Sequence, residues 1–333
     1  MITDARVLQA EFSPKEVEHR DQEVDVLSSA LEPIVAGQPG ETALIFGPSG
    51  AGKTCIAQFT VGRLQEAVGE MNQQYVNCWQ DYTRFRVLYR VLEGIGRAAD
   101  VHRQSTPRDE LLERLRKYDG PQYVVILDEV DQLEDPRVLY DLYRMSNISM
   151  VLITNREEEL FAQMDERLSS RFGSSVRIQF ERYTLDELVS ILSARARWGL
   201  VADAVGRQEL ALIGDAAAGD ARVAIGILRN AAHRASREGV DEISVDVVHQ
   251  SIPDGKDEVR QKTIEQFTEH QQILYNVLVD AGETQPGELY DLYCERVDDP
   301  KTRRTIRNYL SKMDHYKLVV SDGNGRNRTY RLR

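Results

Sequence analysis

The sequence predicts an α/β domain with a parallel sheet, then a small all-helical domain, then a C-terminal unit of three helices and a β-hairpin. In the first two-thirds of the chain, short β-branched runs alternate with amphipathic helical stretches, which is typical of parallel sheets. From about Tyr183 the strand pattern stops and only helical patterns follow. Near the C-terminus, two short strand patterns flank Asp322-Gly323-Asn324-Gly325, a dense turn signal. These three observations predict a fold in three parts.

The expected elements follow from the same patterns. Strands are expected at residues 42–46, 74–77, 123–127, 150–154 and 176–180, with helices at 55–66, 84–98 and 109–117. Thr184-Leu-Asp-Glu187 matches a capping box ahead of Leu188, so a helix should begin there. Further helices are expected at residues 207–217, 220–238, 245–251, 266–280, 286–297 and 301–315, and the hairpin strands at 318–321 and 328–332.

The domain boundaries are placed where these patterns change. Pro253-Asp-Gly-Lys256 combines two helix breakers and predicts a linker. We therefore expect an α/β domain at residues 1–181, a helical lid domain at 182–252, a linker at 253–262 and the C-terminal unit at 263–333.

The composition excludes several classes of protein. Hydrophobic residues make up 41% and charged residues 29%, which suits a folded chain with buried cores. No apolar run approaches the roughly 18 residues of a membrane span, and the N-terminus lacks the pattern of a secretory signal. The three cysteines lie too far apart in the chain to indicate a disulfide framework or a zinc ribbon. We expect a cytoplasmic protein without a membrane partner.

The charge is distributed unevenly along the chain. Residues 300–333 hold ten basic and two acidic side chains, a net charge of +8, which leaves −20 for the rest of a chain whose total is −12. A basic terminus on an acidic body indicates an anionic partner such as nucleic acid, although it could also be a solvated tail. The 34 arginines and 8 lysines, together with the excess of acids, resemble the composition of a salt-adapted protein.

Residues 47–54 match the phosphate-binding P-loop pattern, G-x-x-x-x-G-K-[ST]. The motif stands between an expected strand and an expected helix, where backbone N–H groups can hold phosphates at the positive end of the helix. Lys53 would neutralise the β- and γ-phosphates, and the Thr54 hydroxyl would take one Mg²⁺ position. The predicted cofactors are ATP or ADP with Mg²⁺, and the residues expected to bind them here are Gly47, Pro48, Ser49, Gly50, Ala51, Gly52, Lys53, Thr54 and Cys55.

A strand that ends in two acids follows about 75 residues after the P-loop lysine. Asp128 at the strand end could hold Mg²⁺, directly or through water, and Glu129 could polarise an attacking water. Two acids after a strand often mark only a solvated helix start. The P-loop upstream favours the catalytic interpretation.

Four further side chains carry weaker patterns. Asn155 follows the strand at 150–154 and would reach the same sheet edge, although asparagine also favours turns. Arg167 and Arg171 lie one helical turn apart and could simply pair with nearby acids. Arg222 opens a helix of the lid domain and could act as a local cap or ion pair.

The helix expected at residues 301–315 has one apolar and one polar face. Ile306, Leu310 and Met313 share one face, while Arg304 and Asn308 point the other way. This division is typical of a helix that enters a DNA groove, and a protein-binding unit is the alternative. The residues expected to contact DNA are Arg303, Arg304, Arg307, Asn308, Arg326 and Arg328.

Taken together, these motifs resemble those of a known family. GPSGAGKT, VVILDEVDQL, LITN, DERLSSRF and GDARVAIGILRNAA, in this order and spacing, look like an AAA+ ATPase. More narrowly, the chain resembles the archaeal replication initiators of the origin-recognition and cell-division-cycle (Orc/Cdc) type. His19-Arg20-Asp21, Tyr75-Val-Asn-Cys78 and the GDAR motif indicate this family. The expected C-terminal unit agrees with it, because three helices followed by a β-hairpin is the element order of a winged-helix domain. The resemblance extends from about Phe12 to Arg333.

The resemblance implies a role for each matching position. Lys53 and Thr54 correspond to the phosphate and Mg²⁺ groups, and Asp128 and Glu129 to the acidic pair. His19 and Arg20 fall where the family's chain passes the adenine pocket.

Three matches concern sensing and assembly. Asn155 corresponds to the first sensor, and Arg222 to the second sensor, which contacts the γ-phosphate from the lid. The arginine finger, which completes a neighbour's site, corresponds to Arg167 or Arg171.

The function implied by the resemblance is that of an initiator ATPase located at the nucleoid. It would bind double-stranded origin DNA, use ATP binding and slow hydrolysis as a switch, and help recruit or load the MCM helicase, with other initiator protomers as further partners. Two alternatives remain: a clamp-loader-type assembly ATPase, and a DNA-binding regulator that uses nucleotide only as a sensor. At 333 residues the chain is short for the family, which leaves open both a principal initiator and a divergent paralogue.

Overall fold

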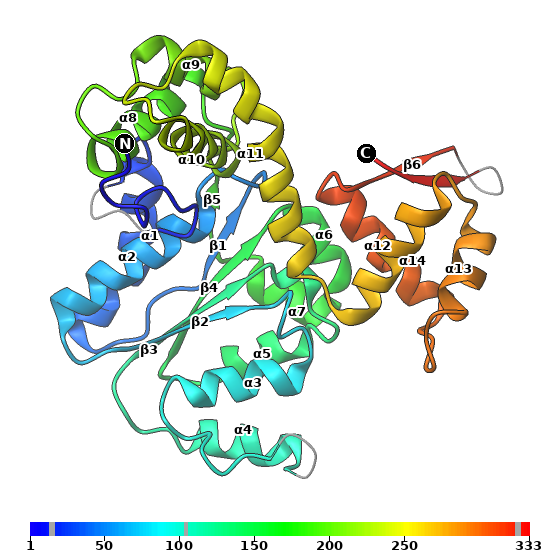
Figure 1. Ribbon diagram of the computed structural model, residues 1–333. Coiled ribbons are helices and arrows are strands. Elements are labelled where there is room, and N and C mark those ends of the chain that lie inside the picture. The colour runs from blue at the N-terminus through cyan, green and yellow to red at the C-terminus, as the bar shows by residue number, and fades with distance from the viewer. Residues whose placement is uncertain (13–16, 103–105, 324–327) are drawn as a thin grey trace. The chain divides into compact units, whose positions relative to one another are not determined.

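The computed structural model describes residues 1–12, 17–102, 106–323 and 328–333, and it divides into two compact units, Met1–Lys256 and Asp257–Arg333 (Figure 1). The first unit contains the sheet and the lid helices, and the second contains the C-terminal helices and hairpin. Of the helices in the described ranges, none is both long enough and apolar enough to cross a bilayer.

A parallel five-stranded sheet forms the centre of the first unit. Its strands are β1 (Ala43–Phe46), β2 (Asn72–Asn77), β3 (Tyr123–Asp128), β4 (Ile148–Thr154) and β5 (Val176–Gln179), in the spatial order β2-β3-β4-β1-β5. The register pairs Phe46 with Thr154 and Asp128 with Ile153, so β1, β3 and β4 end at the same edge of the sheet. All five expected strands are present, and this shared edge brings the P-loop, the acidic pair and Asn155 together.

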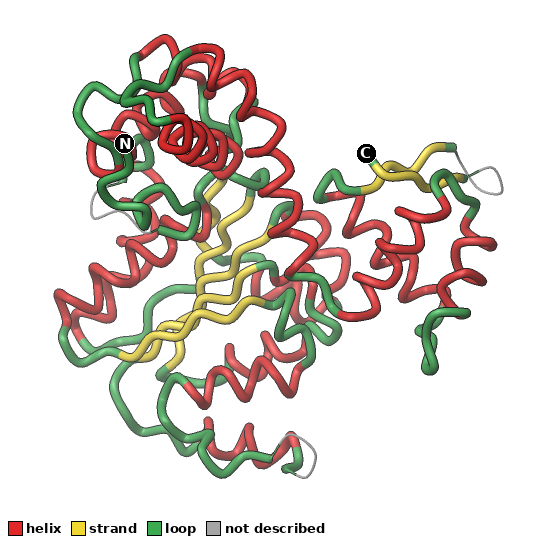
Figure 2. The backbone as a smooth tube through the Cα atoms, in the orientation of Figure 1, coloured by secondary structure: helices red, strands yellow, loops and turns green. Residues whose placement is uncertain are grey.

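Helices cover both faces of this sheet (Figure 2). They are α1 (Asp21–Leu31), α2 (Lys53–Val68), α3 (Arg84–Glu93), α4 (Arg108–Arg116), α5 (Arg137–Tyr143), α6 (Glu157–Gln163) and α7 (Glu166–Phe172), with the 3-10 helices η1 (Glu32–Ala36) and η2 (Val130–Gln132). Alternate residues of β3 point to opposite faces. Val124 and Ile126 pack with α1 and α2, whereas Val125 and Leu127 pack with α3 and α5.

The lid domain consists of α8 (Leu185–Gly199), α9 (Arg207–Ala217), α10 (Ala221–Glu238) and the first half of α11 (Val245–Glu265) around one apolar core. The predicted capping box is confirmed at the start of α8, where the side chains of Thr184 and Glu187 each pair with the other's backbone N–H. The structure differs from the predicted domain bounds at the N-terminus. Leu8 is 1% exposed and belongs to the lid core, so residues 1–12 pack on the lid although they precede the sheet in sequence.

The structure also differs at the predicted linker, residues 253–262, which is helical. Helix α11 continues through Pro253, although proline removes one backbone donor from the helix. Helix α11 is held against α10 at Gly255, where an added Cβ would lie 2.7 Å from the Ile227 backbone. The Pro-Asp-Gly-Lys segment is therefore helical and makes a close helix contact, and the boundary of the two compact units follows Lys256 within the same helix.

The second unit has the element order of a winged helix. Its elements are α12 (Glu269–Ala281), α13 (Pro286–Cys294), α14 (Arg303–His315), β6 (Val319–Asp322) and β7 (Thr329–Leu332). Strands β6 and β7 are antiparallel, and Thr284 adds a short bridge to Tyr330 of β7. The predicted inward face of α14 is confirmed, because Ile306, Leu310 and Met313 are all at most 3% exposed. The last two residues of the predicted hairpin turn, at 324 and 325, lie outside the described residues.

Candidate nucleotide-binding site

The P-loop between β1 and α2 has a backbone shape that requires glycine. Gly47 and Gly50 have φ angles of 144° and 78°. A Cβ on Gly47 would lie 2.2 Å from the Phe180 carbonyl oxygen, and one on Gly50 would lie 2.0 Å from a carboxylate oxygen of Asp220. Both positions combine an unusual φ with close approach of other atoms, so side chains are excluded. The loop thereby brings its backbone N–H groups to the N-terminus of α2.

Lys53 is the cation at the centre of the loop. It is 8% exposed, and its Nζ donates to the carbonyl oxygens of Gly47 (2.6 Å) and Pro48 (2.9 Å) and to Oδ1 of Asn155 (3.0 Å). Burial lowers the pKa of Lys53 to about 8, Asp128 opposes this shift, and Arg222 adds to it. A phosphate in the loop would favour the charged form of the lysine. The lysine environment therefore fits an anionic ligand.

Asp128 is held by two hydroxyl groups from different elements. Its Oδ2 accepts hydrogen bonds from Thr54 Oγ1 (2.6 Å) and from the Tyr75 hydroxyl (2.9 Å). Burial raises the pKa of Asp128, and the two hydrogen bonds oppose that rise. Burial and the nearby carboxylate also raise the pKa of Tyr75, which keeps it a donor. Tyr75 was not predicted as a site residue, because nothing in the sequence shows that β2 lies beside β3.

The pair Thr54 and Asp128 fits a Mg²⁺ ion that is shared with phosphates. Mg²⁺ is usually bound by one or two protein oxygen ligands together with phosphate oxygens and water. Within the described ranges, no group of three or more His, Cys, Asp or Glu residues could form a metal site of its own. The protein oxygens present therefore suit a nucleotide-bound ion better than a separate metal centre.

Asn155 and Glu129 complete the edge of the sheet. Asn155 is 9% exposed at the end of β4, and the preceding Thr154 donates to Oδ1 of Asp131 (2.9 Å). Glu129 follows β3 with φ 56° and ψ 47°, a left-handed conformation that is uncommon for residues other than glycine. Strained backbone of this kind occurs often at functional sites. Both residues line the same cavity as Lys53.

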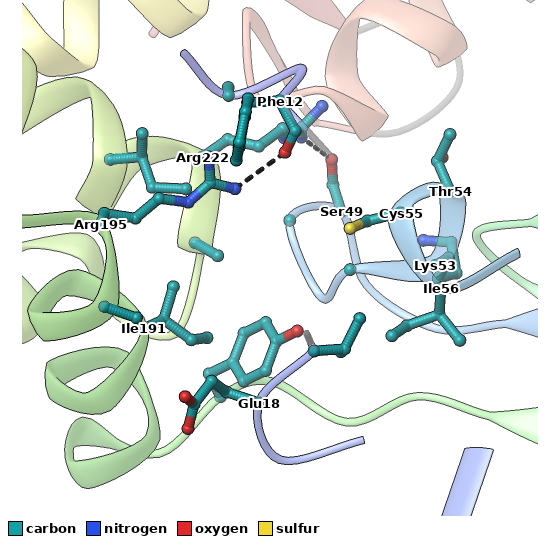
Figure 3. Close-up of a pocket in the computed structure, with 18 of the residues that line it drawn as sticks. Phe12, Glu18, Ser49, Lys53, Thr54, Cys55, Ile56, Ile191, Arg195 and Arg222 are labelled. Carbon is teal, nitrogen blue, oxygen red and sulfur yellow. Dashed lines mark hydrogen bonds between the residues drawn. The ribbon is translucent and has the colours of Figure 1, made fainter. Parts of the chain in front are cut away.

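Arg222 reaches the P-loop from the lid. It lies in the first turn of α10, and its guanidinium donates to the Ser49 hydroxyl (Figure 3). The neighbouring Ala221 N–H donates to the Gly50 carbonyl oxygen (3.1 Å). Asp220 caps α10 by accepting hydrogen bonds from the Arg222 and Val223 N–H groups. The lid is thus in direct contact with the phosphate-binding loop.

These groups line a cavity of about 630 Å³. In Figure 3, Ser49, Lys53 and Thr54 lie on one side of the cavity, and Ile191 and Arg195 lie on the opposite side. Its polar lining residues include Ser49, Lys53, Thr54, Asp128, Glu129, Asn155 and Arg222, and also Asp4, Glu18, Arg195 and Arg197. The apolar lining residues include Val7, Ala10, Phe12, Val17 and Ile191. Cys55 also lines the cavity, and burial raises the pKa of its thiol. Such a cavity suits a ligand that has a highly charged part and a less polar ring.

His19 and Arg20, predicted at the adenine pocket, do not line the cavity. Arg20 is 6% exposed, pairs with Glu23 (2.7 Å) and places its guanidinium 4.3 Å from the centroid of the Tyr183 ring. Tyr183 itself lines the cavity. Arg20 therefore supports a wall of the cavity from behind, because its side chain is directed into the protein.

Arg167 and Arg171 lie on α7 and do not line the cavity. Arg167 is exposed. Arg171 donates to the Arg167 carbonyl oxygen (3.1 Å), and its guanidinium lies 5.0 Å from the centroid of the Tyr140 ring. A residue that acts on a neighbouring protomer would lie outside its own site, as both arginines do.

Most predicted DNA contacts lie on the exposed face of α14. Arg304, Arg307 and Asn308 are exposed. Arg303 is also on α14, but it pairs with Asp291 (3.4 Å) and lies 4.3 Å from the Tyr290 ring centroid. Arg328 is half-buried, and Arg326 lies outside the described residues.

Comparisons with known proteins agree with this architecture. The model of the AAA domain matches residues 38–161, and that of the Cdc6 AAA+ ATPase-type lid domain matches residues 189–252. The ORC1-type DNA replication protein 1 of Halobacterium salinarum is 54% identical over 308 residues, which cover 92% of this chain and 100% of the relative. This chain belongs to the ORC1-type DNA replication protein family. ORC1-type DNA replication protein 9 of the same organism is 50% identical over 332 residues, with 100% of this chain and 94% of the relative covered.

A solved structure matches this ORC1-type chain over nearly its full length. The Aeropyrum pernix ORC1 protein, solved in complex with DNA, has a TM-score of 0.77 and 25% identity, and the match covers 99% of this chain and 93% of that one. The predicted family and fold class are therefore confirmed. Membership of the family makes this chain an AAA+ replication initiator, and the AAA+ class is one of ATPases.

Proposed function

We propose that this ORC1-type protein binds duplex origin DNA in a manner controlled by ATP and helps to recruit or load the replicative MCM helicase. ATP binding and slow hydrolysis would be the switch. The observation that carries the proposal is the convergence of Lys53, Asn155 and Arg222 on one cavity from α2, β4 and the lid helix α10. A replication origin is the expected DNA target because of the family to which the chain belongs.

The proposed switch depends on the third phosphate of the nucleotide. Lys53 and Asn155 belong to the sheet domain, whereas Arg222 belongs to the lid, so a γ-phosphate that contacts all three would favour the closed arrangement of the lid. A ligand shifts a conformational equilibrium only by its difference in affinity for the two states. ADP lacks the γ-phosphate, so it would favour the closed lid less than ATP does. ATP and ADP would therefore populate different lid positions.

Hydrolysis would use the acidic pair. Thr54 and Asp128 would hold Mg²⁺, which neutralises charge on the phosphates when it is bound. Glu129 would orient the attacking water, and an arginine from a neighbouring protomer would complete the site. Arg167 fits that last role better than Arg171, whose guanidinium is already held over Tyr140. A site that needs a neighbour would make ATP turnover by a single chain slow.

DNA binding would use the outer face of α14. Arg304, Arg307 and Asn308 are exposed on one helix, and the inner face of that helix is fully occupied by the core of the second unit. Two of the three side chains are cations, and the third is an amide that can read an adenine edge. The solved complex of the A. pernix relative shows that a protein of this fold binds DNA.

Duplex footprinting at high salt, with ATP and with ADP, tests the proposal. An initiator should protect a defined site, and the protection should differ between the two nucleotides. The same footprint with both nucleotides would support a regulator that only senses nucleotide. A lack of localised protection on origin-containing DNA would support the clamp-loader alternative and contradict the proposal.

A further inference from the structure

The N-terminal strap, which we define as residues 1–12, is bound to the lid. The Val201 N–H donates to the Met1 carbonyl oxygen (2.9 Å), the Thr3 N–H donates to the Gly199 carbonyl oxygen (2.9 Å), and Ile2 forms a β-bridge with Leu200. Leu8 fills a place in the lid core. The strap therefore belongs to the lid in space.

A single arginine holds the C-terminal half of the strap. Arg195 of α8 is 8% exposed and donates to the carbonyl oxygens of Val7 (2.7 Å), Gln9 (3.3 Å) and Phe12 (3.0 Å). Its guanidinium also lies 5.0 Å from the centroid of the Phe12 ring, and Figure 3 shows it directed from the lid toward Phe12. One side chain thus satisfies three carbonyl groups that no regular secondary structure pairs.

This arginine is unusual because its partners are neutral. In the described part of the chain, the hydrogen bonds and the ring contact of Arg195 are all to uncharged groups, and burial lowers its pKa. A buried cation without a counterion carries a desolvation cost. Apolar side chains of similar volume often stabilise a fold as well as buried charges do, so stability alone does not explain an arginine at this position. The residues that it fixes suggest what this costly arrangement is for.

Those residues form part of the nucleotide cavity. Val7, Ala10 and Phe12 line the cavity, and so does Arg195 itself. The P-loop and Arg222, which contacts Ser49 of that loop, would hold the phosphates of a bound nucleotide, and this leaves the strap side chains for its base and sugar. Ile191, on the same helix as Arg195, continues this apolar wall.

We propose that Arg195 is a positioning residue for the nucleoside part of the ligand: it fixes the strap to the lid so that Val7, Ala10 and Phe12 form a wall against the base and sugar. Since Arg222 belongs to the same lid, contact with the nucleoside and contact with the γ-phosphate would form together when the lid closes. This inference rests on the proposed nucleotide-binding function.

The test compares ATP with inorganic triphosphate, which has the phosphates but no nucleoside. Calorimetry in the presence of Mg²⁺ would give both affinities for wild type, Arg195→Met and Arg195→Lys. We expect Arg195→Met to lower the affinity for ATP about tenfold, because the wall is no longer pre-organised, and to leave the affinity for triphosphate within about twofold. Arg195→Lys keeps the charge but reaches fewer carbonyls, so its effect should be intermediate.

Two controls separate positioning from general stability. Arg207→Met removes an exposed lid arginine that pairs with exposed Asp186, and it should change neither affinity. Hydrogen exchange should show faster exchange within residues 1–12 in Arg195→Met. If Arg195→Met does not fold, Phe12→Ala removes one side chain of the wall instead. This variant should also bind ATP more weakly and bind triphosphate with nearly the wild-type affinity.

Other outcomes would overturn the inference. If Arg195→Met lost affinity for ATP and for triphosphate equally, Arg195 would act on the phosphate-binding groups or on the whole fold. An unchanged ATP affinity in Arg195→Met would exclude any role at the site. If wild type bound triphosphate and ATP equally well, the wall would make no contact, whereas failure of wild type to bind either ligand would contradict the proposed function itself.

Discussion

Asp128 depends on residues that are distant in the sequence. One carboxylate oxygen accepts hydrogen bonds from the P-loop hydroxyl of Thr54 and from Tyr75 on the next strand. The first neighbour follows from a known motif, whereas the second follows only from the strand order. The contact between Lys53 and Asn155 is of the first kind, because the P-loop and Asn155 follow strands that are expected to end at the same edge of the sheet. The contacts of Arg195 are of the second kind, because no local sequence pattern indicates them.

Glu129 is expected to act on hydrolysis and not on binding. Glu129→Gln removes the charge that orients water but leaves Thr54 and Asp128 in place. ATP should bind with nearly the wild-type affinity, and turnover should fall about a hundredfold or more. Lys53→Ala should instead weaken nucleotide binding itself. Single-turnover assays and binding titrations check this, and wild-type turnover by Glu129→Gln would refute the catalytic assignment.

Tyr75 is expected to position Asp128 for the metal ion. Tyr75→Phe removes the hydroxyl and leaves the ring, so the fold should be retained. The affinity for Mg²⁺ in the presence of nucleotide should fall about tenfold, the lower end of the range for a group that orients a metal ligand. Nucleotide affinity measured in EDTA should not change. A similar loss with and without Mg²⁺ would show that Tyr75 supports the cavity in general.

At the scale of elements, the sequence predicts what depends on periodicity. The five strands follow from short β-branched runs, and the lid helices and the apolar face of α14 follow from the helical repeat of 3.6 residues; all are present in the structure. Three features could not be predicted, because they depend on tertiary contacts: the docking of residues 1–12 on the lid, the helical state of residues 253–262, and the inward direction of Arg20. Proline and glycine together predicted a linker, but packing of α11 on α10 outweighs their tendency to break a helix.

The contact between α10 and α11 gives a stability prediction. A Cβ at Gly255 would meet the Ile227 backbone at 2.7 Å, so Gly255→Ala should lower the free energy of unfolding by about 1–3 kcal/mol. Gly62 on α2 is a matched control, because a Cβ there meets nothing within 4 Å. Gly62→Ala should raise stability by up to about 1 kcal/mol through helix propensity. Denaturant unfolding gives the free energy of unfolding of both variants. Equal changes in Gly255→Ala and Gly62→Ala would contradict the close packing of Gly255 on Ile227.

The basic face of α14 gives a prediction about salt. If Arg304 and Arg307 contact phosphates, each substitution by alanine should reduce the slope of log affinity against log salt by about 0.9, whatever the DNA sequence. If Asn308 contacts a base, Asn308→Ala should cost about 1–3 kcal/mol and relax the preference at one position. Arg207→Ala, on the lid, is the control and should change neither. Unchanged affinity and slope in all three α14 variants would exclude this helix as the main DNA contact.

At the scale of the whole molecule, the central claim is that the nucleotide state controls DNA binding through the lid. Residues 300–333 carry a net charge of +8 and the rest of the chain carries −20, so the proposed DNA contacts and the nucleotide site are assigned to parts of the chain that differ in charge. Coupling between them must be reciprocal: if ATP raises the affinity for DNA, then DNA raises the affinity for ATP by the same factor. Arg222 connects the lid to the P-loop and should be needed for that coupling.

The most direct test is the affinity for duplex origin DNA, measured with saturating ATP and with saturating ADP in wild type, Glu129→Gln and Arg222→Ala. The account predicts a difference between the two nucleotides in wild type, of about 5- to 150-fold. Glu129→Gln should keep that difference, because it binds ATP without hydrolysing it, and Arg222→Ala should lose it. Equal DNA affinity of the wild-type protein with ATP and with ADP would contradict the central claim.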